Sequence, residues 1–192
     1  LQRRDLNQGL TEAFTYDGLD RVTNSTLNGS TNLSVSYDAS GNVLQKSDLG
    51  QYVYGDSTHP HAVTTAGSES FTYDRNGNRL KTTDPLSHAT TSSYDALNRL
   101  LTMTDPGLGV TSYAHDNAGN LAGVTDSRDL TTTYGHDGLG NPVSQVSPDT
   151  GITTRTFDAA GNVKTSTDAR GAKATTTYDA AGRVTKVVHS QT

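Results

Sequence analysis

Apolar and polar residues alternate over short segments of this chain, and turn-forming residues follow each segment. In residues 70–73, Ser-Phe-Thr-Tyr, every second residue is aromatic, which predicts a half-buried β-strand. Residues 74–78, Asp-Arg-Asn-Gly-Asn, are typical of a tight turn, and residues 80–83 predict the return strand. A second turn over 84–87 leads into another strand at 89–94. Two strands and two turns describe one β-hairpin per unit.

This unit recurs at a fixed spacing. An aspartate that follows an aromatic residue or a histidine occurs eight times, at Asp17, Asp38, Asp74, Asp95, Asp116, Asp137, Asp158 and Asp179. Successive copies are 21 residues apart, except for an interval of 36 residues between Asp38 and Asp74. A fixed period over most of a chain indicates a repeat protein in which neighbouring units stack on one another.

Three columns of residues define the repeat. The position before the aspartate is occupied by Tyr16, Tyr37, Tyr73, Tyr94, His115, His136, Phe157 and Tyr178. Three positions after the aspartate come residues that tolerate the left-handed backbone region, namely Asp20, Gly41, Gly77, Asn98, Gly119, Gly140, Gly161 and Gly182. Ten positions after it, a second acidic residue opens the second turn, at Asp48, Asp84, Asp105, Asp126 and Asp168.

The whole chain, residues 1–192, reads as one repeat array without a second domain. The long interval holds 15 additional residues, which we place at about 51–66. We expect them to form an extra hairpin, or an ordered loop with a small core of its own.

The composition favours an extended β-structure. Leu, Val, Ile and Phe make up 34 of 192 residues, and the mean hydropathy is -0.61, which is low for a compact globular core. The net charge is only -5, however, and the chain is rich in Thr, Val and Tyr, which favour strands over disorder. We therefore expect an antiparallel sheet with one modest apolar face.

Composition also narrows the classes of function. A pI near 5.6 without a basic run gives no electrostatic footprint for nucleic acid. The absence of cysteine excludes disulfides and thiolate metal sites, and no apolar run is long enough for a membrane span. Residues 1–5 contain no signal-peptide core and no initiator Met, so we expect the chain to be part of a larger protein.

The motifs resemble those of the RHS, or YD-repeat, family of large bacterial surface and polymorphic-toxin proteins, to which insecticidal toxin complexes and animal teneurins are related. The resemblance covers residues 12–192. It rests on Y-D-x-x-G-N/R at the eight positions above and on T-D-P at residues 83–85 and 104–106. Residues 54–64, Tyr-Gly-Asp through His-Pro-His-Ala-Val-Thr, also look like an insertion of bacterial RHS proteins.

This resemblance implies a long antiparallel sheet that spirals into a hollow shell around a C-terminal toxin or effector polypeptide, delivered to competing or host cells. The implied partners are further RHS repeats of the same protein and the enclosed cargo, and the implied location is secreted or on the bacterial surface. The chain contains no Asp-Pro-x-Gly-Leu-like cleavage box and no separate toxin domain. It therefore corresponds to a piece of the shell wall, with no catalytic residue, cofactor or metal expected.

The tyrosine and aspartate columns also have other possible interpretations. The tyrosine column is suited to a carbohydrate-binding ladder, but cross-strand packing of aromatic rings is the favoured explanation, because repeats must stack an apolar face to be stable. An extracellular glycan- or cell-surface-binding module is therefore the alternative function. The aspartates suggest calcium, but they lie ten or eleven residues apart, and turn capping accounts for each one singly.

Metal and catalytic sites have less support. Asp56, His59 and His61 have the donor types of a metal site, as do the histidines of the 21-residue period, His88, His115 and His136, but neither set has a convincing fourth ligand. Asp126 and Asp129 have the residue types of an acid–base carboxylate pair, although acids are commonplace in turns. Three Asn-x-Ser/Thr sequences, at Asn24, Asn28 and Asn32, are read as polar turn and strand residues rather than glycosylation sites.

Overall fold

The computed structural model describes residues 2–5 and 9–191 of the chain. The regular secondary structure in these ranges consists of β-strands. Strands that follow one another in sequence pair antiparallel. The all-β, antiparallel architecture expected from the sequence is therefore confirmed. No helix in the described ranges is long and apolar enough to cross a membrane.

The chain divides into two compact units that meet between Thr91 and Ser92. The first holds β1 (Gln2–Asp5), β2 (Leu10–Tyr16), β3 (Val22–Leu27), β4 (Ser30–Tyr37), β5 (Val43–Lys46), β6 (Gly50–Val53), β7 (Thr65–Ala66), β8 (Glu69–Tyr73) and β9 (Arg79–Thr83). Strand β10 (Ala89–Tyr94) crosses the boundary. The second unit continues with β11 (Leu100–Thr104), β12 (Val110–His115), β13 (Leu121–Thr125), β14 (Thr131–His136), β15 (Pro142–Ser147), β16 (Gly151–Phe157), β17 (Val163–Thr167), β18 (Lys173–Tyr178) and β19 (Val184–Ser190).

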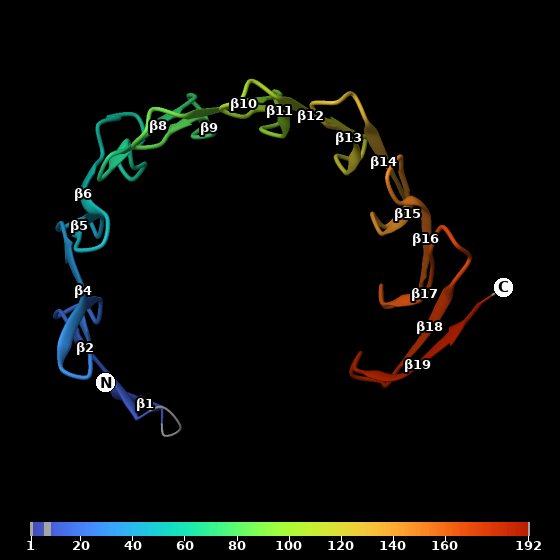
Figure 1. Ribbon diagram of the computed structural model, residues 1–192, viewed down its shortest axis with the longest axis horizontal. Helices are drawn as coiled ribbons and strands as arrows, with labels where there is room; N and C mark the ends of the chain where they lie inside the picture. The colour runs from blue at the N-terminus through green and yellow to red at the C-terminus, as the bar shows by residue number, and fades with distance from the viewer. Residues whose placement is uncertain (1, 6–8, 192) are drawn as a thin grey trace. The chain divides into compact units, whose positions relative to one another are not determined.

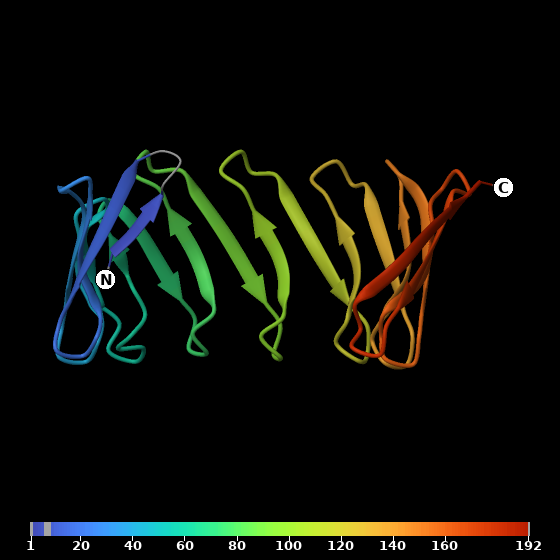
Figure 2. The same cartoon turned by 90° about the horizontal axis from the view of Figure 1, so that it is seen from below.

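Two kinds of turn alternate along each unit. We call the five-residue turns that begin at the repeat aspartates YD turns, and the turns between them second turns. Because consecutive strands pair and run antiparallel, all YD turns of a unit lie at one edge of its sheet and the second turns at the other. Figure 2 shows this alternation in the second unit. The two aspartate columns are thus at opposite ends of the strands, as their spacing predicts.

A β-bulge accompanies the YD turns. In the hairpin of β16 and β17, Phe157 pairs with Val163 and Thr156 pairs with Thr165, so Lys164 is the extra residue of the bulge. The same shift occurs next to Tyr37, Tyr73 and Tyr178. Bulges increase the local twist of a sheet, and the strands of the second unit, taken by itself, turn progressively along the chain in Figure 1.

The sheet is a single layer. The accessible surface is 12740 Å², whereas a compact protein of this mass exposes about 8800 Å². Among the residues whose side chains are described, the buried apolar core consists of Ala66 alone, and Ser25 is the buried polar residue. In the part of the chain that the structure describes, no second layer packs against the sheet, which explains why the sequence is poor in large aliphatic residues.

The two faces of the second unit differ in chemistry. Strand alternation and register place Tyr113, Tyr134, Arg155 and Phe157 on one face, all half-buried. The opposite face carries hydroxyl pairs from neighbouring strands, at 2.6 to 3.1 Å, made by Ser93–Thr102, Thr125–Thr131, Thr156–Thr165 and Thr177–Thr185. The modest apolar face predicted from the sequence is thus a mixed face of aromatic and polar side chains.

The additional residues of the long interval form an extra hairpin. Strands β6 and β7 pair with each other, and β5 and β8 flank them in the sheet. The loop 54–64 between β6 and β7 therefore stands where a YD turn would stand. The extra hairpin is one of the two forms expected for this segment, and it amounts to a shortened repeat.

The assignment of Asp48 to the second-turn column is wrong in structural terms. Asp84 bonds the backbone of its own turn, but the side chain of Asp48 instead contacts Lys46 at 3.4 Å. The residue with positive φ, Gly50 at 96°, lies two positions after Asp48, whereas Ser87 lies three positions after Asp84. The turn is therefore out of step with the aspartate by one residue.

Candidate functional site

Each YD turn is built around the carboxylate of its aspartate. In the turn 158–162, Oδ1 of Asp158 accepts hydrogen bonds from the backbone N–H groups of Ala160 and Asn162, both at 2.9 Å. Oδ2 accepts a third from the side-chain amide of Asn162 at 3.0 Å. The backbone N–H of Asp158 donates to the Asn162 carbonyl at 2.9 Å, and that of Gly161 donates to the Asp158 carbonyl at 3.1 Å. Gly161 has φ of 80°, which a glycine adopts without strain.

The left-handed column predicted from the sequence is confirmed at all eight positions. The φ angles are positive at Asp20, Gly41, Gly77, Asn98, Gly119, Gly140, Gly161 and Gly182. The same geometry recurs in four second turns, where the positive φ falls on Ser87, Leu108, Asp129 and Gly171. The repeat therefore alternates two turns of nearly the same construction.

These hydrogen bonds lower the pKa of the turn carboxyls. For Asp158 the side-chain amide and then the backbone N–H of Asn162 are the main causes. For Asp38 and Asp84, desolvation is the largest single effect and raises the pKa, but the hydrogen bonds together outweigh it. The pKa is lowered at Asp17, Asp38, Asp56, Asp74, Asp84, Asp95, Asp116, Asp126, Asp137, Asp158, Asp168 and Asp179.

The last residue of a YD turn connects the turn to its neighbour. Arg21 forms an ion pair with Asp17 at 2.7 Å, and its guanidinium also donates to the carbonyl of Asp38 at 3.4 Å. The same guanidinium lies 4.5 Å from the ring centroid of Tyr37. The sequence motif includes this Asn/Arg position, but its role between turns was not recognised from the sequence. The available signal was a column of the repeat that holds only Asn or Arg.

The tyrosine column contributes a second connection, which we call the hydroxyl clasp. The hydroxyl of Tyr37 donates to the carbonyl of Val22 at 2.9 Å, and that of Tyr178 donates to the carbonyl of Val163 at 2.9 Å. Each bond joins two strands next to the YD edge, beyond the last pair of their ladder. The tyrosine hydroxyls therefore form hydrogen bonds between strands. This structural role favours the packing interpretation of the column over the carbohydrate-binding one.

The shortened repeat uses the same clasp. Tyr54 donates to the carbonyl of Val43 at 3.0 Å, and Tyr73 donates to that of Val63 at 2.8 Å. Tyr54 thus occupies the role of a column tyrosine although no YD motif marks it.

The histidines of the shortened repeat bridge the YD turns on either side of it. The Nδ1 of His61 lies 2.7 Å from Oδ1 of Asn42, in the turn 38–42. The Nε2 of His59 lies 3.2 Å from the carbonyl oxygen of Arg75, in the turn 74–78, and its Nδ1 lies 2.8 Å from Oδ2 of Asp56. Both ring nitrogens of His59 face acceptors, and only the imidazolium donates from both at once.

The histidines and aspartates that have the donor types of metal ligands make other contacts in the structure. The described residues contain no group of three or more His, Asp or Glu side chains that could hold a metal ion. The Nδ1 of His88 contacts Asp84 at 2.9 Å, within one turn. Asp126 and Asp129 belong to one turn, in which Asp129 has φ of 62° and its backbone N–H donates to the Asp126 carbonyl. The contacts of both aspartates are those of turn residues.

The protonation of His59 gives a prediction for the first unit. The side-chain hydrogen bond to Asp56 is the main cause that raises the pKa of His59, while the pKa of Asp56 is lowered to about 2. Because the pKa of His59 is raised by folding, the stabilisation is complete below the unfolded value of about 6.5 and is lost as the pH rises through the folded value. We expect an NMR titration of His59 with a midpoint above that of the unfolded chain.

The variant Asp56→Asn should lower this midpoint and increase amide exchange in the loop 54–64 at neutral pH. Ser57→Ala, a change in the same loop, serves as the matched control and should leave both unchanged. A His59 midpoint that is insensitive to Asp56→Asn would contradict the assignment of the imidazolium.

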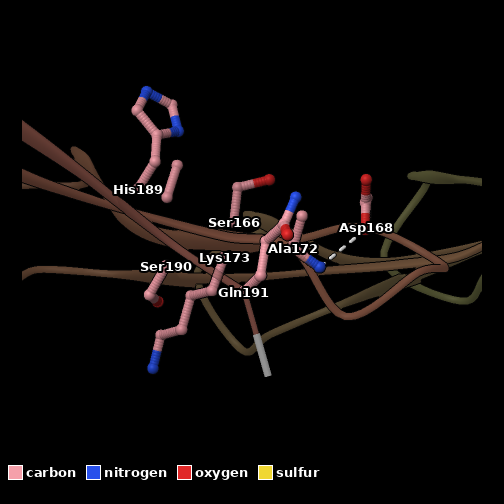
Figure 3. A pocket seen from close by; sticks show the side chains of 8 residues that line it. Ser166, Asp168, Ala172, Lys173, His189, Ser190 and Gln191 are labelled. Carbon is pink, nitrogen blue, oxygen red and sulfur yellow. Dashed lines mark hydrogen bonds between the residues drawn. The ribbon is translucent and has the colours of Figure 1, made fainter.

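The depressions of the surface are open. One, of about 520 Å³, is lined by Ser166, Asp168, Lys173 and His189, among others. Figure 3 shows His189 and Ser166 on one side of the strands and Lys173 on the other. Residues on opposite sides of a single-layer sheet do not enclose one ligand, so this depression is a feature of the sheet end.

The geometry defines a class of protein, a single-layer antiparallel sheet of tandem β-hairpins held in register by aspartate turns. Comparison with known families then identifies it. The RHS repeat family matches residues 73–110, 94–129, 115–152 and 157–192, together more than half of the chain. The chain belongs to the RHS repeat family.

Solved structures with the same fold come from toxin complexes. The crystal structure of TcdB2-TccC3-TEV superimposes with a TM-score of 0.59 and 16% identity, over 95% of this chain and 13% of that one. The Tc holotoxin pore of Photorhabdus luminescens gives a TM-score of 0.52 and 14% identity, over 99% of this chain and 14% of that one. The chain therefore spans about one seventh of the length of these proteins. A comparison with curated proteins finds no match.

Proposed function

We propose that this chain is a segment of the wall of an RHS-type shell that encloses a C-terminal toxin or effector polypeptide until delivery. The proposal includes further RHS repeats of the same protein and the enclosed polypeptide as partners, and secretion or display on the bacterial surface as the location. The fold shared with toxin-complex structures supports it.

The single-layer sheet is the observation that carries the proposal. A domain that folds to bind or to catalyse buries a core beneath its site, whereas this chain buries almost none and leaves both faces accessible. A sheet of this kind is suited to continue into neighbouring repeats and to separate two spaces.

The lack of a strongly apolar face also fits an enclosing role. Hydroxyl pairs lie on one face of the second unit together with the exposed side chains of Val146 and Ile152, and half-buried aromatic and polar side chains lie on the other. Because both faces mix apolar and polar side chains, we expect only weak apolar contact with a partly folded cargo, which would not compete with its release. The glycan-binding alternative gains no support, because the hydroxyls of Tyr37 and Tyr178 are bonded to the backbone.

The parent protein that contains this segment provides the test. We expect its C-terminal polypeptide to resist trypsin under conditions in which the same polypeptide, expressed alone, is digested at least about tenfold faster. Equal rates of digestion would contradict containment.

Two deletions in the parent protein sharpen the experiment. Deletion of residues 138–158 removes one 21-residue repeat and keeps every later YD turn at its own edge, so protection should largely survive. Deletion of residues 127–137 removes one strand and joins Asp126 to Gly138, which transfers all later YD turns to the opposite edge. Protection should then be lost. If both deletions behave alike, the wall arrangement is wrong.

A further inference from the structure

The hydroxyl clasp is not present at every repeat, and its distribution singles out part of the second unit. The clasp requires a tyrosine in the column before the repeat aspartate. At three consecutive positions the column instead holds His115, His136 and Phe157, none of which has a hydroxyl. Tyr178 restores the clasp in the next repeat, with its bond to Val163 at 2.9 Å.

Other residues weaken the same strands. Pro142 is the partner of His136 in the ladder between β14 and β15, and proline has no backbone N–H to donate. Gly135 precedes His136 in β14, and Gly123 lies in β13, where a glycine costs backbone entropy and contributes no side-chain packing. These features belong to consecutive strands.

The histidine at position 115 shows what replaces the clasp. Its Nδ1 is buried and has no hydrogen-bond partner. A buried polar atom without a partner lowers stability instead of adding an inter-strand bond. The imidazole therefore keeps a ring in the column, but it provides no connection of the kind that Tyr37 and Tyr178 make.

From these observations we propose that strands β12–β16 form the segment at which the second unit opens locally, and that the tyrosine hydroxyl decides which strand pairs open. The pair β15–β16 ends at Phe157 next to the YD edge, and the pair β17–β18 ends at Tyr178. Both pairs lie inside the sheet and belong to the same kind of hairpin, closed by a second turn. At the column position they differ by a single oxygen atom, because Phe157 lacks the hydroxyl that Tyr178 has.

A local opening segment matters for a repeat sheet because strands in such a sheet contact only their neighbours. Separation of one strand pair breaks one ladder and leaves the adjoining hairpins intact. The proposal concerns the stability of this unit and does not depend on the containment function, so either one can fail without the other.

Amide hydrogen exchange, followed by mass spectrometry on the full chain, tests the proposal with a reciprocal pair of variants. In the unmodified chain, amides of β12–β16 should exchange faster than those of β17–β18. By register, the Pro142 carbonyl takes the place relative to Phe157 that the Val163 carbonyl has relative to Tyr178. Phe157→Tyr should therefore add a clasp hydrogen bond and slow exchange in β15–β16 by about three- to tenfold. Tyr178→Phe removes one oxygen and should accelerate exchange in β17–β18 by a similar factor.

Both variants keep an aromatic ring, so a general loss of folding is not expected from either. Amides of β2–β4 in the first unit serve as the internal reference and should not change. Exchange that is equal in β15–β16 and β17–β18 before mutation, a missing response in either variant, or a change shared by the whole unit would each overturn the proposal.

Discussion

Acidification is expected to unfold this protein over a narrow range of pH. We expect the melting temperature to stay nearly constant from about pH 6 to about pH 5 and to fall by more than about 10 °C as the pH approaches 3. The expected cause is the twelve turn carboxylates, each of which accepts hydrogen bonds that its protonated form loses in part.

The direction follows from the lowered pKa values. In the folded chain the pKa of residues such as Asp116, Asp137 and Asp158 lies below the ordinary value of 3.8, chiefly because of the side-chain amides of Asn120, Asn141 and Asn162. The stabilisation is therefore complete above the unfolded pKa and is lost as the pH falls through the folded pKa. Unfolding at acid pH should accordingly take up protons.

Thermal melts by circular dichroism across this range, with calorimetry for the proton uptake, measure the effect. Because hydrogen bonds are short-range, the profile should persist in 0.5 M salt, where longer-range charge interactions are largely screened. Asp158→Asn keeps one acceptor oxygen but places an NH₂ group, a donor, opposite the side-chain amide of Asn162, which also donates. The variant should lower stability at neutral pH and make the melting temperature less dependent on pH. A melting temperature that is flat down to about pH 3 would contradict this account.

The second large effect is expected at the left-handed position of a single turn. Gly140 has φ of 80°, and a Cβ atom there would lie 3.3 Å from Oδ1 of Asn120 in the preceding turn. We expect Gly140→Ala to lower the free energy of unfolding by about 1–2 kcal/mol, because an L-residue at this φ is strained. This corresponds to a fall in melting temperature of roughly 2–8 °C.

The same turn supplies the matched control. A Cβ at Gly138 would meet nothing within 4 Å, and its φ lies outside the left-handed range. Gly138→Ala should therefore be neutral, or stabilising by about 0.4–1 kcal/mol. Gly140→Asn should cost less than Gly140→Ala, because Asn98 takes the equivalent position with φ of 62°. If the two alanine variants melt together, backbone conformation is not what selects glycine here.

The sequence predicts the parts of this fold that depend on local chemistry. The aspartate column and the left-handed column three residues later both act within one turn, so their pattern along the chain is sufficient to place them. Leu108 is the instructive exception, because it has φ of 67° although leucine has no preference for that region. The turn of Asp105 imposes the conformation, and only the periodic spacing of that aspartate points to it.

The remaining contacts could not be predicted, because they use backbone atoms, which every residue has, or residues outside the repeat pattern. The hydroxyl of Tyr178 bonds the backbone carbonyl of Val163, and every residue type offers a carbonyl. His61 reaches Asn42 across 19 residues through a loop of unique sequence, so no column marks the pair. Sequence reasoning therefore located the tyrosines and histidines and left their partners open.

The shortened repeat has a consequence for how such arrays lengthen or contract. It replaces 21 residues with 15, yet it still contributes two strands, β6 and β7, and the chain returns to the same edge afterwards. What an array must preserve is thus an even number of strands per inserted or deleted segment, and not a number of residues. Duplication or loss of whole hairpins leaves every later YD turn at its own edge of the sheet. Insertion or loss of a single strand would move all later YD turns to the opposite edge and exchange the two faces of the sheet that follows.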